Sequence, residues 1–367
     1  MNLIYYYPGK KGAPSNVARN IFDALYNRQS ELPFEKMIIF TDSKYKSTLA
    51  GKYEDIKILG TKEILEISKK DIIHIPVSPF VFPNAKFLLH LFAKIKNNKI
   101  VLNYHGDLRN EINLKYKLER KLDITGIPTY ILIPTLLVRA NKIIVNSHIL
   151  ESILVNNYGV KSIEVIPNAV ENYWYSKNQE IIVRKKNKYE IFYHGRLSPE
   201  KGVDILITGF HEFLHKKNYP NDITLYIAGE GPQKKDLESL VQRQKIDRNV
   251  IFLGNIDKKL INAYLKKVDG AIYPSIWDNF PLSILEALAS ANCPVYFSKK
   301  IGICDFLTEE DVLNIFNPDT KSIKEIFDCI FENASEKKIV EKQKEFAKKY
   351  TWDKVINCYI KLYNEIV

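Results

Sequence analysis

The chain has few cysteines, and their spacing matches neither a metal site nor a disulfide framework. Four cysteines occur in 367 residues, all of them after residue 290, and no two are separated by only two residues. This pattern excludes the common zinc motifs and fits a protein of the reducing cytoplasm. No two aspartates lie two positions apart, so the Asp-x-Asp pattern that binds a metal–diphosphate complex is missing. We therefore expect neither a metal ion nor a cofactor.

Long apolar runs are also missing. The longest uncharged run, residues 124–138, contains Pro128 and Pro134 and is shorter than the ~20 residues of a membrane-spanning helix. We interpret it as a buried helical segment, with a segment that enters the membrane interface as the alternative. The first residues, "MNLIYYYPGKKG", have no long apolar core of the kind found in signal peptides. A cytoplasmic protein is the expectation.

Acidic residues are outnumbered by basic ones. Lys and Arg number 54 against 43 Asp and Glu, which gives a formal net charge of +11 and a pI near 9.1. Residues 86–121 hold nine Lys or Arg and three acids. Such a segment forms either a solvated basic face or a surface for anionic phospholipid or lipid-linked phosphate on the inner face of the cell membrane. Nucleic acid is not expected as a partner, because no arrayed basic and aromatic motif accompanies the charge.

Strand-like and helix-like segments alternate along the whole chain. The expected strands are 3–7, 36–40, 71–76, 99–105, 142–147 and 163–168, followed by 189–195, 223–229, 250–254, 270–275 and 293–298. Helical patterns separate them, for example at 15–28 and 148–157. Strands that alternate with helices predict βαβ units and parallel sheets. Two such series predict an α/β fold of two Rossmann-like domains, with the boundary in the polar stretch 168–188.

Two acids bracket a predicted helix start in "YPSIWDNFPLSILEALA" (273–289). Asp278 lies on the loop after a short strand, Pro281 suits the first helical turn, and Glu286 lies inside the helix. The helical neighbours of Glu286 include no cation. Free amides at a helix start between carboxylates suit a polyhydroxylated, partly anionic ligand. The alternative is that Asp278 only caps the helix and Glu286 pairs with a distant lysine.

Two cations surround another predicted helix start in "FYHGRLSPEKGVDILITGF" (192–210). Ser198 is a plausible N-cap and Pro199 a plausible first helical residue, which places Lys201 in the first turn and Arg196 just ahead of it. Cations are unfavourable at this end of a helix. A diphosphate between Arg196 and Lys201 would resolve the conflict, and a pair of exposed cations is the alternative.

Other loops after predicted strands could hold parts of a ligand. Gly229 and Gly231 form a Gly-x-Gly without a third glycine, a weak dinucleotide signal. Gly254 ends a strand and can leave backbone groups for a base. Gly12 and the residue after it let backbone approach a phosphate, although the P-loop spacing is absent. His105 directly follows a strand and is either structural or part of a site.

The loop motifs resemble those of one enzyme family. The segments "GRLSPEKGVDILI", "IAGEGP", "FLGNI" and "PSIWDNFPLSILEALASANCPV" resemble, in this order, the retaining glycosyltransferases with two Rossmann-like domains (the GT-B fold), group 1 or family four. The match is strong over 189–300. In the first half "HGD", "IIVNS" and "VIPNAV" match, and "YTWDKVINCYIKLY" resembles the last helix of the family, which crosses back to the N-terminal domain.

The resemblance implies a domain division and roles for the charged residues. Residues 1–168 would bind the acceptor, 169–350 the nucleotide sugar across a cleft, and 351–367 would form the returning helix. Arg196 and Lys201 would hold the donor diphosphate. Glu286, the second acid of the family's Glu-x7-Glu motif, would bind ribose hydroxyls. Asp278 stands where the first Glu is usual and would contact the donor sugar.

The resemblance also implies backbone contacts and a contribution from the first half. The amides beside sugar and phosphate would be those of Asn279, Phe280 and Leu282. His105 would meet the sugar from the opposite domain, and Gly12 and Ala13 would approach the diphosphate. The chain departs from the family pattern at Asp278, which is shorter than Glu, and at three alanines in place of customary glycines: Ala13, Ala169 and Ala291. None of these changes removes a phosphate-binding cation.

These implications predict an enzyme. It would transfer a hexose-type sugar from a UDP- or GDP-sugar to a hydroxyl of a glycan or lipid-linked saccharide, without a metal and with retention of the anomeric configuration. Such a reaction belongs to the synthesis of surface polysaccharides or glycoconjugates. The alternatives are a GT-B relative that acts as an epimerase or phosphorylase, and a non-catalytic protein that binds nucleotide sugars.

Overall fold

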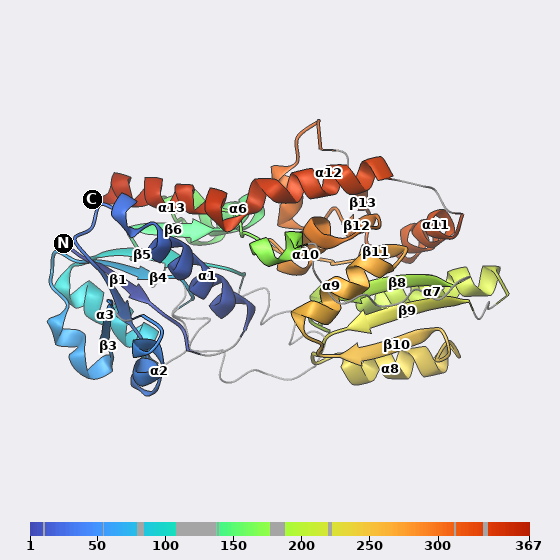
Figure 1. Cartoon of the computed structure of the whole chain (residues 1–367), viewed down its shortest axis with the longest axis horizontal. Helices are drawn as coiled ribbons and strands as arrows, with labels where there is room; N and C mark the ends of the chain where they lie inside the picture. The colour runs from blue at the N-terminus through green and yellow to red at the C-terminus, as the bar shows by residue number, and fades with distance from the viewer. Residues whose placement is uncertain are drawn as a thin grey trace. The chain divides into compact units, whose positions relative to one another are not determined.

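The computed structural model separates into two compact units. It describes residues 1–9, 12–53, 55–78, 84–107, 137, 139–176, 188–218, 222–311, 313–332 and 337–367. The N-terminal unit comprises Met1–Asn168 together with Trp352–Val367, and the C-terminal unit comprises Ala169–Thr351. The chain therefore leaves the N-terminal unit after Asn168 and re-enters it at Trp352 (Figure 1).

The N-terminal unit is built on a parallel sheet of seven strands in the order β3-β2-β1-β4-β5-β6-β7. The strands are β1 Leu3–Tyr6, β2 Met37–Phe40, β3 Lys57–Leu59, β4 Ile72–Ile75, β5 Lys99–Asn103, β6 Lys142–Val145 and β7 Ile163–Val165. The helices are α1 Ala13–Asn27, α2 Lys46–Ala50, α3 Ala85–Lys96, α6 His148–Tyr158 and α13 Trp352–Ile366. The winding reverses between β1 and β4, as in doubly wound folds.

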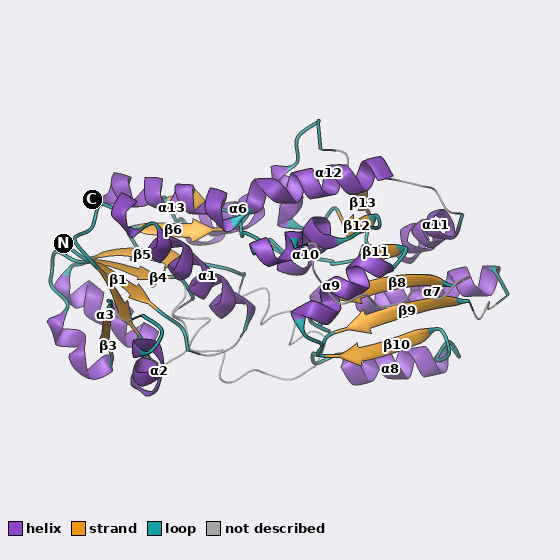
Figure 2. Ribbon diagram, in the orientation of Figure 1, coloured by secondary structure: helices purple, strands orange, loops and turns teal. Residues whose placement is uncertain are grey.

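The C-terminal unit repeats this plan with six parallel strands in the order β10-β9-β8-β11-β12-β13. The strands are β8 Tyr189–His194, β9 Ile223–Ala228, β10 Val250–Gly254, β11 Gly270–Tyr273, β12 Val295–Ser298 and β13 Asn314–Phe316. The helices are α7 Val203–Lys216, α8 Lys234–Arg243, α9 Lys258–Lys267, α10 Leu282–Ser290, α11 Thr320–Phe331 and α12 Lys337–Ala347. Its winding reverses between β8 and β11. Helices flank both sheets (Figure 2).

Short 3-10 turns complete the chain at Gln29–Glu31, Ser43–Tyr45, Thr61–Glu66, Asn172–Tyr175, Pro199–Lys201, Gly302–Phe306 and Lys348–Tyr350. Local signals explain several helix ends. The Ser147 side chain accepts from the Leu150 amide and begins α6, and Gly159 ends that helix at φ +63°. The Asn84 side chain caps α3 in the same way.

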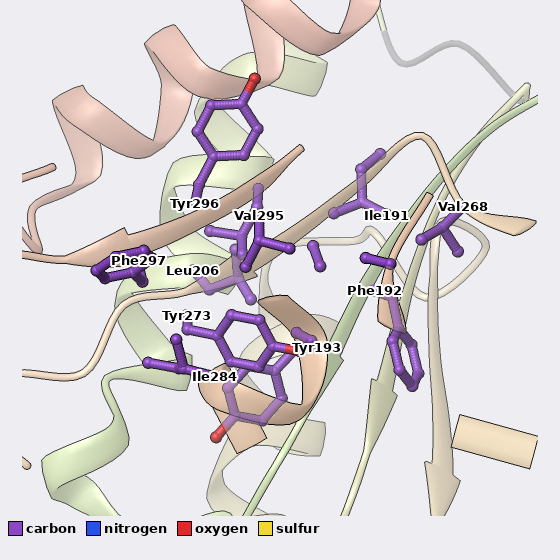
Figure 3. Close-up of a cluster of buried hydrophobic side chains, with 14 of the residues drawn as sticks. Ile191, Phe192, Tyr193, Leu206, Val268, Tyr273, Ile284, Val295, Tyr296 and Phe297 are labelled. Carbon is purple, nitrogen blue, oxygen red and sulfur yellow. The ribbon is translucent and has the colours of Figure 1, made fainter. Parts of the chain in front are cut away.

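The strands form because their apolar residues are buried on both faces of the sheets. Every residue of β1, β2, β11 and β12 is buried, which is typical of central strands in doubly wound folds. Figure 3 shows this core in the C-terminal unit, where Tyr193 of β8 and Tyr273 of β11 pack together with their ring centroids 5.7 Å apart. The carboxyl ends of these two strands are thus held rigidly side by side.

A buried polar network attaches α13 to the sheet of the N-terminal unit. His74 of β4 lies 2.5 Å from the hydroxyl of Tyr363 and 2.7 Å from Oδ1 of Asn103. The Asn103 amide donates to the hydroxyl of Tyr359, one turn before Tyr363 on α13. All four residues are buried. The last helix therefore completes the core of the first unit.

The α/β class with two Rossmann-like units, predicted from the alternating pattern, is confirmed. All eleven predicted strands are present and most are shorter than predicted. The edge strands β3 and β13 were not predicted, since three residues give too little of a pattern.

The predicted helical run 124–138 lies outside the described residues except for Leu137. Of the basic residues in 86–121, Lys86, Lys94, Lys96 and Lys99 are described. Within the described ranges no helix is both long and apolar enough to span a bilayer.

Candidate active site

Two loops meet where the winding of the C-terminal sheet reverses. One follows β8 and contains the 3-10 turn Pro199–Lys201, and the other joins β11 to α10. The amide of Ile276 donates to the carbonyl of Glu200 over 2.8 Å. A Cβ on Gly202 would lie 2.3 Å from the carbonyl oxygen of Pro274. The loops are therefore packed backbone to backbone, at the place where doubly wound folds bind ligands.

Lys201 and Asp278 form an ion pair between these loops. The Lys201 ammonium donates to a carboxylate oxygen of Asp278, and both side chains are more than four-fifths buried. The carbonyl of Asp278 also accepts from the amide of Gly302 over 2.9 Å, which anchors the loop from the other side. The prediction placed these two residues in one site, and the structure brings them into contact.

The prediction that an α-helix begins at Pro199 is wrong. A single 3-10 turn spans Pro199–Lys201, Gly202 then adopts a left-handed conformation at φ +63°, and α7 begins only at Val203. The Ser198 side chain makes no capping hydrogen bond there and donates to Glu200 instead. Lys201 thus lies before the helix, and its charge is balanced by Asp278.

Arg196 is the exposed cation of the site. Its guanidinium makes no ion pair with any part of the chain that the structure describes. Its carbonyl accepts from the hydroxyl of Tyr193 over 3.2 Å, which holds the loop in place. Burial and the carboxylates of Asp278 and Glu200 raise the pKa of Tyr193, so the hydroxyl stays a donor. An anion at this loop would meet one uncompensated guanidinium and the ammonium of Lys201.

Glu286 pairs with a buried histidine. Its carboxylate lies 3.3 Å from Nε2 of His194, the last residue of β8, and Nδ1 of that ring lies 2.7 Å from the hydroxyl of Tyr273. Because a carboxylate only accepts, Nε2 carries the hydrogen of this contact. Phe192 and Trp174 stack on the ring, with centroids 5.6 and 6.5 Å away. Glu286 is held in one orientation with about a fifth of its side chain exposed.

These contacts decide against the alternatives considered for the two acids. No side chain caps α10, whose N-cap position is Pro281, so Asp278 is not a helix cap. Glu286 pairs with His194, and no lysine of the described ranges forms an ion pair with it. His194 is not among the residues that the motifs indicate. The only sequence feature that could have pointed to His194 is its place at the carboxyl end of a predicted strand, in "FYHGRL".

The start of α10 offers free amides beside these side chains. Leu285 is the first residue of the helix whose amide bonds within it, to the carbonyl of Pro281. In the described part of the chain, the amides of Leu282, Ser283 and Ile284 have no hydrogen-bond partner. The hydroxyl oxygen of Ser283 lies 3.7 Å from the position that a Cβ on Gly195 would take. The helix start therefore faces the loop that carries Arg196.

Two residues just before α10 are buried. The Phe280 ring packs on Phe306 and Tyr350 with centroid distances of 5.4 and 5.7 Å, and Asn279 is 4% exposed. The side chain of Phe280 therefore belongs to the core. The predicted contacts of the Asn279, Phe280 and Leu282 amides with sugar and phosphate remain predictions.

Gly229 and Gly231, which follow β9, are needed for close backbone packing. The Gly229 amide donates to the carbonyl of Gly254 over 2.7 Å. A Cβ on Gly229 would lie 1.9 Å from the carbonyl oxygen of Gly195, and one on Gly231 would lie 2.1 Å from that of Leu197. These contacts hold three loops at one edge of the sheet. The proposed contact of Gly229 and Gly254 with the donor remains a prediction.

Three of the predicted residues lie in the N-terminal unit. Gly12, at φ +141°, precedes α1, and both it and Ala13 are exposed. His105 follows β5, and its Nε2 donates to the carbonyl of Pro76 over 2.7 Å. Burial lowers the pKa of His105, a shift that this hydrogen bond opposes and Lys86 adds to, so the ring is neutral near pH 7. These residues share the carboxyl edge of the first sheet, and their role toward a donor remains a prediction.

The described ranges contain no group of three or more His, Cys, Asp or Glu side chains that could hold a metal ion. The four cysteines, all of them described, form no disulfide. The groups assembled at the reversal point are of two kinds. Arg196, Lys201 and the α10 amides can bind an anion, whereas the carboxylates of Asp278 and Glu286 can accept from hydroxyl groups.

Comparison with protein families identifies this arrangement. The group 1 glycosyl transferase model matches residues 175–350, and the glycosyltransferase family 4 model matches residues 43–172. The chain is a glycosyltransferase of the group 1 and family 4 type. An uncharacterized glycosyltransferase of Methanocaldococcus jannaschii, MJ1059, is 26% identical over 364 residues, which cover 89% of this chain and 84% of that protein.

Two further relatives are similar to this glycosyltransferase. Glycogen synthase of Mycobacterium tuberculosis is 35% identical over 114 residues, which cover 31% of this chain and 27% of that enzyme. The structure of Anabaena Alr3699/HepE in complex with UDP-glucose covers all of both chains with a TM-score of 0.72 and 18% identity. At that identity the likeness shows the fold, GT-B, and the same protein has also been solved with UDP.

Proposed function

We propose that this glycosyltransferase transfers a hexose-type sugar from a UDP- or GDP-sugar to a hydroxyl group of a glycan or lipid-linked saccharide. The observation that carries the proposal is the pairing at the reversal point of the C-terminal sheet. There an exposed guanidinium, an ammonium and free helix amides lie beside two carboxylates. A nucleotide sugar presents the matching groups, a diphosphate between two polyhydroxylated rings. The UDP and UDP-glucose complexes of a protein of the same fold support this choice.

Each residue would act on a separate part of the donor. Arg196 and Lys201 would bind the diphosphate and stabilise the negative charge that it gains as it leaves. Glu286, oriented by His194, would accept from the two ribose hydroxyls. Asp278 would accept from a hydroxyl of the donor sugar while keeping its contact with Lys201. One carboxylate would thereby connect the sugar to the phosphate-binding cation.

The reaction replaces one bond at the anomeric carbon. The acceptor oxygen forms its bond to that carbon and passes its proton to the departing diphosphate, and the bond to the diphosphate breaks with the electron pair going to the phosphate oxygen. We propose that the anomeric configuration is retained and assign no enzyme nucleophile. Because the two cations and the α10 amides neutralise the leaving group, no metal is required. The pathway would be the assembly of a surface polysaccharide or glycoconjugate.

A calorimetric titration with UDP and GDP in the presence of EDTA tests the donor site. We expect one nucleotide to bind the wild type and the Lys258→Ala control, in which an exposed lysine paired with Glu171 is removed. The Arg196→Ala/Lys201→Ala variant should bind neither. No binding to folded wild type would contradict the proposal, and so would equal binding to the double variant.

Product analysis tests the rest of the proposal. With a UDP- or GDP-sugar and an oligosaccharide acceptor, the anomeric configuration of the product read by NMR should match that of the donor. An inverted product would contradict retention, and loss of activity with EDTA would contradict the metal-free mechanism. Transfer to water or phosphate alone would instead indicate a hydrolase, an epimerase or a phosphorylase.

A further inference from the structure

Three lysines from separate segments gather at the amino edge of the C-terminal sheet. Lys266 lies in the last turn of α9, Lys344 lies in the last turn of α12, and Lys348 follows four residues later in a 3-10 turn. Asn292 connects the two helices, because its side-chain oxygen accepts from the Lys344 ammonium over 2.9 Å and its backbone amide donates to the carbonyl of Leu265 over 3.2 Å. Since α9 precedes β11 and Asn292 precedes β12, this lysine cluster lies at the sheet edge opposite the candidate active site.

The ammonium groups of the lysine cluster bond only to neutral oxygen atoms. Among the described residues, no carboxylate forms an ion pair with Lys266, Lys344 or Lys348. The contrast within one helix turn is sharp, since the neighbouring Lys267 pairs with the buried Glu190 over 2.8 Å. Lys266 donates instead to the backbone carbonyl of Ser176 over 2.7 Å. The fold thus supplies acceptors for these lysines but no opposite charge.

Three acids are close to the cluster in sequence, and none compensates it. Glu345 of α12 pairs with Lys342. Asp269, after α9, accepts from the backbone amide of Glu190 over 2.9 Å. Glu341 is exposed and makes no ion pair within the described ranges. The positive charge of the cluster is therefore not balanced by its own surroundings.

The lysines repel one another. Burial lowers the pKa of Lys266. Burial also lowers the pKa of Lys344, with further lowering by Lys266 and Lys348 that the Cys293 thiol partly opposes. The carboxyl ends of α9 and α12 carry roughly half a negative charge each, which offsets only part of three positive charges. Such an excess of like charge breaks the ordinary rules of stability and indicates a site for an oppositely charged ligand.

We propose that the lysine cluster binds the phosphate group of a small phosphorylated molecule. An ammonium group has three N–H donors, and Lys266 and Lys344 each use one of them on the described residues. A phosphate dianion offers several acceptor oxygens together with the negative charge that the cluster lacks. Because the cluster and the donor loops lie at opposite edges of the sheet, the two sites would be separate. The inference therefore does not rest on the proposed function.

Thermal unfolding of the full chain in inorganic phosphate tests the proposal. The parent protein is the Arg196→Ala/Lys201→Ala variant, so that phosphate at those two cations does not contribute, and chloride of equal ionic strength is the reference. Phosphate at about 10 mM should raise the Tm of the parent by about 3 °C. Adding Lys266→Gln/Lys344→Gln should remove most of this shift. In chloride the same change should leave the Tm equal or higher, because it relieves the repulsion.

The control is Lys216→Gln/Lys235→Gln in the same parent, which removes the same charge from α7 and α8. It should keep the full shift. Lys348→Gln changes an exposed side chain and should reduce the shift by about half, since one of three cations is lost; it decides the matter if the double change unfolds the protein. An unshifted parent would overturn the proposal, and so would an equal loss in the control or a shift that survives the cluster changes.

Discussion

The two units share one winding but use their polar residues differently. In the N-terminal unit the polar groups His74, Asn103, Tyr359 and Tyr363 are buried and bond to one another. In the C-terminal unit Lys201, Asp278 and Glu286 lie partly exposed around the reversal point, on the loops and on the helix that follow the strand ends. In the first arrangement the polar groups join secondary-structure elements to one another. In the second they remain accessible to a ligand.

This difference explains why the family resemblance is strong in only one half. The proposed contacts with a diphosphate and a ribose would require particular residue types at particular positions, and Arg196, Lys201 and Glu286 stand in recognisable motifs. A buried hydrogen-bond network requires only that its members fit one another, and many combinations of residues can do so. The motifs of the C-terminal unit therefore reflect the proposed function, whereas the residues of the N-terminal unit mostly reflect its stability.

The largest effect should come from removing Arg196 and Lys201, the proposed phosphate-binding cations of the C-terminal unit. The Arg196→Ala/Lys201→Ala variant should lower kcat/KM by about 10³ or more, because leaving-group stabilisation and donor binding are both lost. His105→Ala, in the N-terminal unit, should leave nucleotide binding unchanged. Steady-state kinetics and UDP or GDP titration measure the two effects. Loss of nucleotide binding in His105→Ala would break the division of roles between the units.

Two glycines with the same backbone angle sharpen the comparison further. Gly12 and Gly229 have φ near +141° and +140°, but a Cβ on Gly12 would meet nothing within 4 Å. Gly12→Ala should therefore add only backbone strain, about 1–3 kcal/mol. Gly229→Ala should add to this the overlap with the Gly195 carbonyl, about 1–3 kcal/mol more. Chemical denaturation monitored separately for each unit by hydrogen exchange would compare them, and equal losses would contradict the packing argument.

Acid should destabilise the N-terminal unit first. Burial lowers the pKa of His74 and of His90 to about 4, whereas a histidine in the unfolded chain titrates near 6.5. Below pH 6.5 the unfolded state takes up the proton first, so stability falls as the pH drops and stops falling near pH 4. The full loss for His74 is about 3 kcal/mol. Hydrogen exchange of β4 and β5 against β8 and β11 between pH 7 and 4 measures it. Equal loss of protection in both units would contradict this prediction.

The smallest effect should come from changing Glu286, the proposed ribose-binding acid. Glu286→Gln keeps the size of the side chain but weakens its hydrogen bonds to hydroxyl groups, which should raise the KM for the donor about 10- to 100-fold. The Gln amide group can also turn toward His194 and rearrange the pair. The kinetics should show KM rising more than kcat falls. Unchanged KM would mean that Glu286 is structural and that the donor is bound elsewhere.

Sequence patterns predict the elements and motifs of this chain better than its long-range contacts. The strands and the start of α10 follow from local periodicity, proline and glycine. The contact between Lys201 and Asp278 joins residues 77 positions apart, and no local pattern encodes it. The break at Gly202 also escapes prediction, because "SPEKG" suits a helix start as well as a 3-10 turn. His194 is hidden for a related reason, since a histidine at a strand end is as often structural as functional.

The return of the chain at Trp352 has a consequence for the order of folding during synthesis. Tyr363 follows its partner His74 by 289 residues, so the ribosome completes the N-terminal unit only after nearly everything else has emerged. The C-terminal unit, in contrast, is one continuous segment, Ala169–Thr351. Although domains generally fold in the order in which they are made, the second unit of this enzyme can close first. Until α13 has been synthesised, the sheet of the N-terminal unit lacks its last helix.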